Sequence, residues 1–188
     1  GQDAFNDSGT NYLYIHGGNI TVDANGDGLD INGAIEMSGG VVQVNGPTEQ
    51  MNAPLDYDGT FVLTGGWIAA AGSSGMAQAP SQTSSQPALM VFFTATQPAG
   101  SLVHIQDSAG KDILTFAPSK DYQSLAFSSP DLVQGETYTI FTGGSSTGAL
   151  NGSLYTGGAY TPGAEYSSFT VTTTVTTLGT GGGGGRRP

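Results

Sequence analysis

The chain has 188 residues, with 15 acidic and 4 basic side chains and a formal net charge of −11 at pH 7. No Lys or Arg precedes Lys111, so the first 110 residues carry acidic side chains without Lys or Arg to balance them. A surface of this kind argues against binding to nucleic acid or to an anionic membrane. The absence of Cys excludes disulfides and thiolate metal sites, and no apolar run reaches the roughly 18 to 20 residues of a membrane span. The length allows one domain, or one domain and a small second lobe.

The first 72 residues contain a degenerate repeat. Gly-Gly pairs begin at residues 17, 39 and 65, and each pair lies between two short segments in which apolar and polar residues alternate. Acidic turns recur between the pairs, at residues 3–9, 27–33 and 53–59. A repeat of roughly 20 to 30 residues built from strands and glycine corners is typical of a β-solenoid, in which each repeat is one coil. We therefore predict an all-β protein whose residues 1–76 form the coils of a parallel β-helix.

Stacking of the coils would place equivalent side chains in rows about 4.8 Å apart. Two inward apolar rows are predicted, one from Ile15, Met37 and Leu63 and one from Phe5, Leu29 and Leu55. The glycine pairs are expected at corners where a Cβ atom would clash or where φ must be positive. A phosphate-binding loop is excluded because its motif and its following helix are missing from the sequence.

The acidic turns of successive coils also align. Asn6, Asp30 and Asp56 fall in one column, Ser8, Asn32 and Asp58 in the next, and Asp3 and Asp27 in a third. Carboxylates stacked without Lys or Arg in reach repel one another, whereas Ca²⁺ binds six to eight such oxygens. We predict a calcium site built from Asp3, Asn6, Asp27, Asp30, Asn32, Asp56 and Asp58. The alternative is that these residues form Asx-turns on a solvated edge.

The run Gly26-Asp27-Gly28-Leu29-Asp30-Ile31-Asn32-Gly33, together with Ser38-Gly39-Gly40 and Leu55-Asp56-Tyr57-Asp58-Gly59, resembles a bacterial family of carbohydrate-binding-domain-containing proteins. Later segments, Tyr122–Leu132, Gly135–Gly144 and Leu154–Gly163, resemble it as well. The resemblance implies a secreted, right-handed parallel β-helix with bound calcium, similar to pectate-lyase-type helices and associated with cellulose or acidic, pectin-like glycans. Relative to that family the chain looks short at its N-terminus.

The second half has a different pattern. Residues 77–88 read as a loop or linker, residues 89–178 as a β-rich cap or extension of the solenoid, and residues 179–188 as a Gly-rich tail. Strands are predicted at 89–93, 102–106, 113–116, 125–127, 137–141 and 169–175. The polar turn Asp107–Asp112 between two alternating segments predicts a hairpin. A cap is expected because an uncovered solenoid end is an open sheet edge.

Catalytic chemistry finds little support in the sequence. A polysaccharide lyase needs a Lys or Arg base near its metal, which only Lys111 or Lys120 could supply by folding back. An inverting hydrolase needs two spaced carboxyl groups, and calcium would claim the same ones. His16 aligns with surface positions, and His104 has no acidic residue nearer in its strand than Asp107. We predict no catalytic residue.

Aromatic side chains could stack on sugar rings. The candidates for a carbohydrate-binding surface are Tyr12, Tyr14, Tyr57 and Trp67. A place in the core is the competing interpretation, and it is stronger for Trp67 than for the tyrosines.

The residues thus predict a calcium-stabilised β-helix, and the resemblance implies that it is extracellular or on the cell surface and binds polysaccharide, cellulose or a pectin-like glycan, without cleaving it. The alternative is a structural subunit of an extracellular filament, in which copies of the chain stack head to tail. A polysaccharide lyase ranks third.

Overall fold

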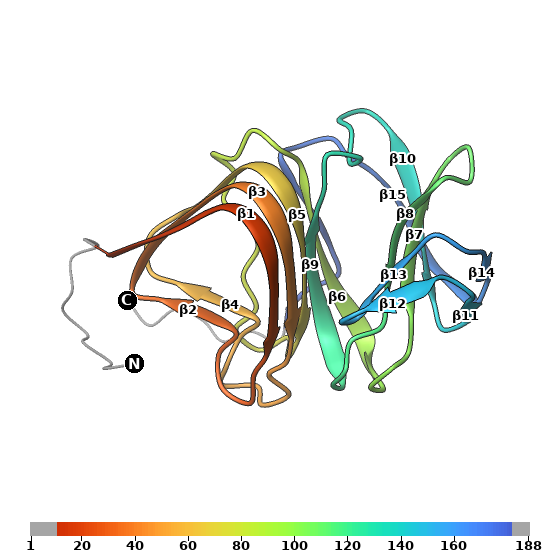
Figure 1. The fold of residues 1–188 in the computed structure, drawn as a ribbon, viewed down its shortest axis with the longest axis horizontal. Coiled ribbons are helices and arrows are strands. Elements are labelled where there is room, and N and C mark those ends of the chain that lie inside the picture. Colours follow the sequence, from red (N-terminus) through yellow and green to blue (C-terminus); the bar gives the residue numbers. More distant parts are fainter. Residues whose placement is uncertain (1–10, 182–188) are drawn as a thin grey trace.

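A computed structural model describes residues 11–181. Within this range all regular elements are β-strands, so the predicted all-β class is confirmed. The described part of the chain contains no helix that is long and apolar enough to span a membrane. Two regions lie side by side, which we call the parallel stack (residues 11–72) and the sandwich (residues 88–178) (Figure 1).

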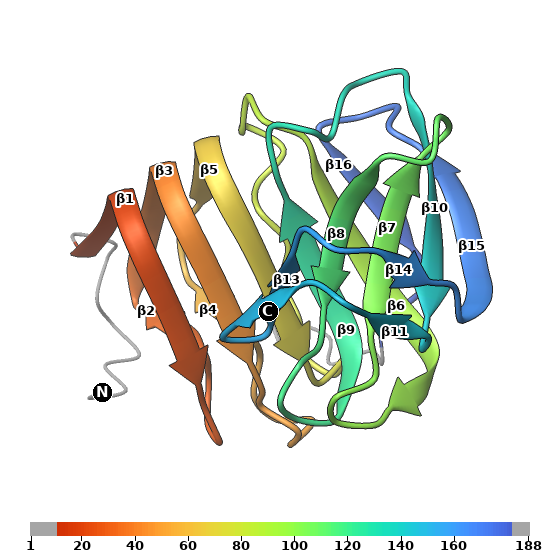
Figure 2. The same cartoon turned by 45° about the vertical axis from the view of Figure 1, so that its right-hand side comes forward.

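The parallel stack has two faces. Its long strands run parallel and are β1 (Asn11–Asp23), β3 (Gly33–Asn45) and β5 (Phe61–Gly72) (Figure 2). Opposite them lie two short parallel strands, β2 (Leu29–Ile31) and β4 (Leu55–Tyr57) (Figure 1).

The register of the stack follows the repeat in the sequence. Ile15 lies beside Met37, and Met37 lies beside Leu63, so the first predicted apolar row is confirmed and is buried. Leu29 lies beside Leu55 in the second row; Phe5, the third member of that row, is outside the described residues. The rows enclose an apolar core between the two faces, which Met90 and Ala126 of the sandwich close at one end.

The glycine pairs form the corners of the long strands. The second glycine of each pair has a positive φ, at +87° for Gly18, +90° for Gly40 and +92° for Gly66. In the second and third pairs the first glycine allows neighbouring strands to approach closely, because a Cβ atom on Gly39 would lie 2.6 Å from the carbonyl oxygen of His16, and one on Gly65 would lie 2.5 Å from that of Ser38. Both predicted reasons for glycine therefore operate.

The end of the stack at β5 is covered along the length of the strand. Residues 68–72 of β5 pair antiparallel with β9 (Tyr122–Ser128) of the sandwich. Along the first half of β5, the hydroxyl groups of Ser81 and Ser84 accept hydrogen bonds from the N–H groups of Phe61 and Leu63, at 2.9 and 3.0 Å. The segment predicted as a loop thus supplies the hydrogen-bond partners that another strand would supply.

The sandwich is antiparallel apart from one parallel pair. Its first sheet continues that of the stack, in the order β1-β3-β5-β9-β6-β16. Its second sheet has the order β12-β13-β8-β7-β10-β15. The remaining strands are β6 (Ala88–Gln97), β7 (Val103–Asp107), β8 (Asp112–Phe116), β10 (Thr137–Thr142), β11 (Ser145–Ser146), β12 (Ala149–Asn151), β13 (Leu154–Thr156), β14 (Tyr160–Thr161), β15 (Ala164–Thr170) and β16 (Val175–Leu178).

A second apolar core fills the space between these two sheets, with Phe116, Phe127 and Tyr138 among its members. The predicted hairpin at 107–112 is confirmed as the turn between β7 and β8. The predicted strand 169–175 is wrong: β15 ends at Thr170 and β16 begins at Val175. The chain crosses there from the second sheet to the first, so one continuous strand is not possible.

Candidate functional site

The predicted acidic columns form within the described range. Asp30 lies beside Asp56 in the β2·β4 pair. Partial burial raises the pKa of Asp56, and the neighbouring charges of Asp27, Asp30 and Asp58 raise it further. Four of the predicted calcium ligands are therefore close enough for their charges to interact. Asp3 and Asn6 lie outside the described residues.

These residues do not fit a calcium centre as they lie. Among residues 11–181, no group of three or more His, Cys, Asp or Glu side chains is arranged to hold a metal ion. Asp27 already accepts the N–H of Ala53 through its Oδ1 atom, at 2.6 Å. The backbone carbonyl oxygen of Asn32 accepts a hydrogen bond from the side-chain amide of Asn11, at 3.2 Å.

A lysine reaches the acidic region from the sandwich. Lys120 extends its Nζ atom to the carboxylate of Asp23 at 2.7 Å, and to oxygens of Ala24 and Asn25 at 2.6 and 2.8 Å. Ser119 donates a further hydrogen bond to Asp23 at 2.7 Å. The pKa of Asp23 is lowered, first by the hydrogen bond from Lys120 and then by that from Ser119. The expectation that the stack has no lysine in reach is thus corrected for this turn.

Two of the predicted aromatic residues form an exposed strip on β1. Tyr12 and Tyr14 are each 53% exposed and stack on one another with ring centroids 5.6 Å apart. Tyr14 stacks in turn on His16, whose Nδ1 atom lies 2.8 Å from the hydroxyl of Ser38 on β3. Tyr57 is different, because its hydroxyl donates to Ala79 and its ring packs against Phe61. Tyr57 is therefore part of the framework rather than of an exposed surface.

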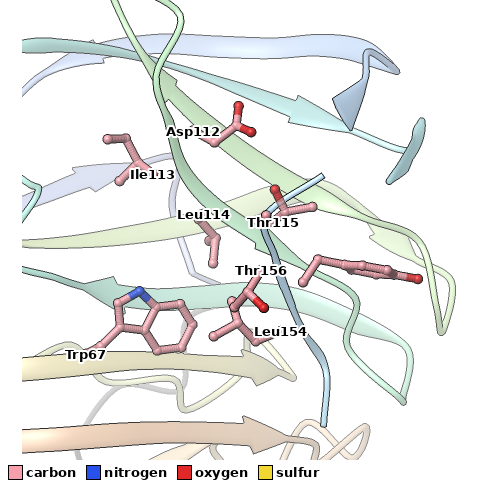
Figure 3. A pocket seen from close by; sticks show the side chains of 9 residues that line it. Trp67, Asp112, Ile113, Leu114, Thr115, Leu154 and Thr156 are labelled. Carbon is pink, nitrogen blue, oxygen red and sulfur yellow. The ribbon is translucent and has the colours of Figure 1, made fainter. Parts of the chain in front are cut away.

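The fourth aromatic residue, Trp67, lines a pocket of about 240 Å³ between β8 and β13. The register of these two strands contains one pair of residues, Leu154 and Phe116. The lining residues are Trp67, Asp112, Ile113, Leu114, Thr115, Leu154, Tyr155, Thr156 and Gly157. In Figure 3 the indole lies near Leu154 and Thr156, while Asp112 lies at the opposite end.

Trp67 is fixed by the sandwich core. Its ring meets the ring of Phe127 edge-on, with centroids 5.6 Å apart, and the residue is partly buried. Trp67 thus packs on the core, as the competing interpretation predicts, and it also lines the pocket, while its stacking on a sugar ring stays a prediction.

Two polar side chains that line the pocket, those of Asp112 and Thr115, contact His104. This histidine is fully buried; its Nδ1 atom lies 2.8 Å from the hydroxyl of Thr115, and its Nε2 atom lies 3.3 Å from Oδ1 of Asp112. Nε2 nevertheless has no hydrogen-bond partner. Burial lowers the pKa of His104, although the charge of Asp112 opposes this shift. The expectation that Asp107 is the nearest acid in the strand misses Asp112, which the hairpin brings alongside.

A flap covers His104 from outside. Residues 143–163 carry β11 to β14, and the ring of Tyr160 stacks on the imidazole with centroids 3.8 Å apart. The hydroxyl of Tyr160 donates to the carbonyl oxygen of Gly143 at 2.8 Å, which ties the flap to its own base. The predicted β7·β8 hairpin places His104 opposite Thr115, but the sequence carries no signal for the stacking of Tyr160 on His104.

Searches among protein families, characterised proteins and solved structures found no match to this chain.

Proposed function

We propose that the protein binds polysaccharide through the Trp67 pocket and does not cleave it. The observation that carries this proposal is the composition of the pocket, where an indole ring lies among threonine hydroxyls and one carboxylate. A flat aromatic ring suits the apolar face of a sugar, and hydroxyl and carboxylate groups suit its hydroxyls. The pocket is smaller than the roughly 300 to 1,000 Å³ of sites for drug-sized ligands, so we expect it to take one sugar unit of a chain.

The absence of cleavage is supported by the groups around the pocket. Asp112 is the one carboxylic acid among the lining residues, whereas most glycosidases use a pair. The two lysines that could act as a lyase base are engaged elsewhere, since Lys111 pairs with Asp131 at 2.7 Å and Lys120 pairs with Asp23. A lyase therefore remains the weakest of the three candidate functions.

The tyrosine strip of β1 offers a second contact for a glycan. Tyr12 and Tyr14 present half-exposed, nearly parallel rings on the outer face of the stack. We include the strip in the proposed binding surface as an accessory contact for a longer chain.

The finer architecture is part of the proposal. We propose that the parallel stack consists of coils of a right-handed parallel β-helix, that the sandwich caps it, and that the protein is extracellular. The parallel registers and the glycine corners support the coils, and the absence of Cys is compatible with secretion. Calcium has less support than the residues first indicated, because the described acidic side chains do not converge.

A filament of copies stacked coil on coil has less support as well. Such stacking needs an open edge at both ends of the stack. β1 lies at the edge of its sheet in the described range, but β5 is already paired with β9 and bonded to Ser81 and Ser84. We therefore rank the filament below glycan binding.

Tryptophan fluorescence tests the proposal directly, because Trp67 is the only tryptophan in the sequence. Titration with cellohexaose should change the emission of Trp67 in a saturable way, without release of reducing ends. Tyr14→Ala serves as the matched variant: it should leave the emission change intact and weaken binding of long chains only.

Two results would count against the proposal. If neither neutral nor acidic oligosaccharides change the emission or bind in calorimetry, glycan binding is wrong. If new reducing ends or unsaturated uronides accumulate, the non-enzymatic assignment is wrong.

A further inference from the structure

We infer that Asp112 is the specificity-determining residue of the Trp67 pocket and restricts it to neutral sugar units, so that uronates are rejected. This inference rests on the proposed function, and it chooses between the two glycan classes, neutral and acidic, that the sequence leaves open.

The first step concerns the charge of the pocket. Apart from Asp112, the lining side chains are apolar, hydroxyl-bearing or glycine. The side chain of Asp112 is 50% exposed, so its carboxylate can meet a ligand. A carboxylate accepts hydrogen bonds from two neighbouring sugar hydroxyls, but it has no proton to offer a uronate, which it repels.

Two neighbouring basic groups, His104 and Lys111, could cancel the charge of Asp112. His104 is the closest basic group, with Nε2 at 3.3 Å from Oδ1 of Asp112. It is fully buried under Tyr160, and burial lowers its pKa, so it stays neutral near pH 7. Lys111 is adjacent in the chain, but its Nζ atom pairs with Asp131 at 2.7 Å. The negative charge of Asp112 is therefore not balanced by either neighbour.

The third step concerns how Asp112 is held. The imidazole of His104 packs behind both polar side chains: Nδ1 lies 2.8 Å from the hydroxyl of Thr115, and Nε2 lies 3.3 Å from Oδ1 of Asp112 without a hydrogen bond. The stacked ring of Tyr160 prevents the imidazole from swinging outward. His104 is thus a positioning residue for Asp112, which lies at the end of the pocket opposite Trp67 (Figure 3).

The whole chain acts in the same direction. Its formal net charge is −11, and the described acidic side chains have no metal-binding arrangement that would offset it. Long-range repulsion slows the approach of a polyanion and is screened by salt, whereas repulsion inside a pocket is screened much less. Salt therefore separates the effect of the whole chain from the effect of Asp112.

The test compares cellohexaose with hexagalacturonate by Trp67 emission, at 20 mM and 500 mM NaCl and without divalent ions. Wild-type protein should bind the neutral oligosaccharide at least about tenfold more tightly at both salt concentrations. Asp112→Asn keeps the shape and removes the charge, and it should bring the two affinities to within about twofold at high salt.

Glu165→Gln is the matched control. Glu165 is exposed on β15, which β7 and β10 separate from β8 in the second sheet, and the substitution changes the net charge equally. It should leave the selectivity unchanged at high salt. His104→Gln should lower the selectivity, whereas a role confined to stability would change the melting temperature and leave the ratio of affinities as it is.

The outcomes separate this inference from the proposed function. If hexagalacturonate binds as tightly as cellohexaose, or if Asp112→Asn leaves the ratio unchanged, the charge filter is wrong while glycan binding stands. If neither oligosaccharide binds, the proposed function itself fails.

Discussion

The parallel stack and the sandwich bring neighbouring strands together in different ways. In the stack, each long strand lies beside the equivalent strand of the next repeat, so Ile15, Met37 and Leu63 meet because they occupy the same place in each unit. In the sandwich, hairpins such as β7·β8 are combined with neighbours from distant parts of the chain, as when Val175 of β16 pairs with Ala88 of β6. Repetition therefore specifies the stack locally, whereas the sandwich depends on how the whole chain closes.

One strand belongs to both regions. On β5, Ile68 and Ala70 face the core of the stack, while Ala69 and Ala71 face the core of the sandwich. Side chains on a strand alternate between its two faces, so a single strand can serve both cores. We expect the two regions to unfold together, because unfolding either one exposes one face of β5.

The glycine corners are where the stack should be most sensitive to substitution. Gly18→Ala should cost roughly 1 to 2 kcal/mol, because its φ of +87° disfavours a side chain although no heavy atom lies within 4 Å of the added Cβ. Gly40→Ala should cost about 2 to 4 kcal/mol, because the Cβ would also lie 2.8 Å from the carbonyl carbon of Gly17. Chemical denaturation followed by circular dichroism measures both.

Gly26→Ala is the control for this pair, since Gly26 has open space around it and no positive φ. It should be close to wild type. Equal costs at Gly18 and Gly40 would show that the close approach of the neighbouring strands contributes nothing.

The stack can be predicted from the sequence because its signal is periodic. Spacings of 22 and 26 residues between glycine pairs were enough to predict the rows and the corners. The acidic columns were predicted for the same reason, but not their fit to a metal, because convergence of side chains depends on distances that spacing alone does not give.

The pocket could not be predicted in this way. Trp67 comes from the stack, Asp112 from a hairpin and Leu154 from the flap, and nothing repeats among them. A register shift between Ile105 and Gln106 places Asp112 beside Gln106, which a regular hairpin would not do. The contact of Lys120 with Asp23 also joins residues that are distant in sequence and share no pattern.

Substitution of Lys120 tests how much its contact stabilises the joint between the stack and the sandwich. Its side chain is 20% exposed, and Lys120→Met removes a charged donor from Asp23 and from the carbonyl of Ala24. We expect a loss of about 1 to 2 kcal/mol at pH 7, since Asp23 is half exposed and solvent weakens the pair. The pKa of Asp23 is lowered in the folded state, so its contribution is complete above the ordinary value of 3.8 and is lost as the pH falls below it.

Denaturation midpoints between pH 2 and pH 7 measure this effect. Lys111→Met is the matched control, because Lys111 and Asp131 form an exposed pair within the sandwich, and we expect no measurable change. A Lys120→Met protein as stable as wild type at pH 7 would mean that the contact of Lys120 contributes nothing measurable to the joint between the two regions.

The smallest effect on stability is expected at Asp56. It lies in the stack among carboxylates whose negative charge the sandwich does not balance. Asp30 is its direct neighbour across the strands, so Asp56→Asn should stabilise the protein by about 0.5 kcal/mol at pH 7 in EDTA. The pKa of Asp56 is raised in the folded state, so the wild-type deficit is present at neutral pH and disappears as the pH falls toward 3.8. The gain from the substitution should disappear over the same range.

Calcium reverses the prediction if it binds: 5 mM CaCl₂ would then raise the melting temperature of wild type above that of Asp56→Asn. Equal melting temperatures of wild type with CaCl₂ and with EDTA would instead leave the acidic columns as a solvated edge, whose repulsion the fold tolerates because the buried rows of the stack stabilise it.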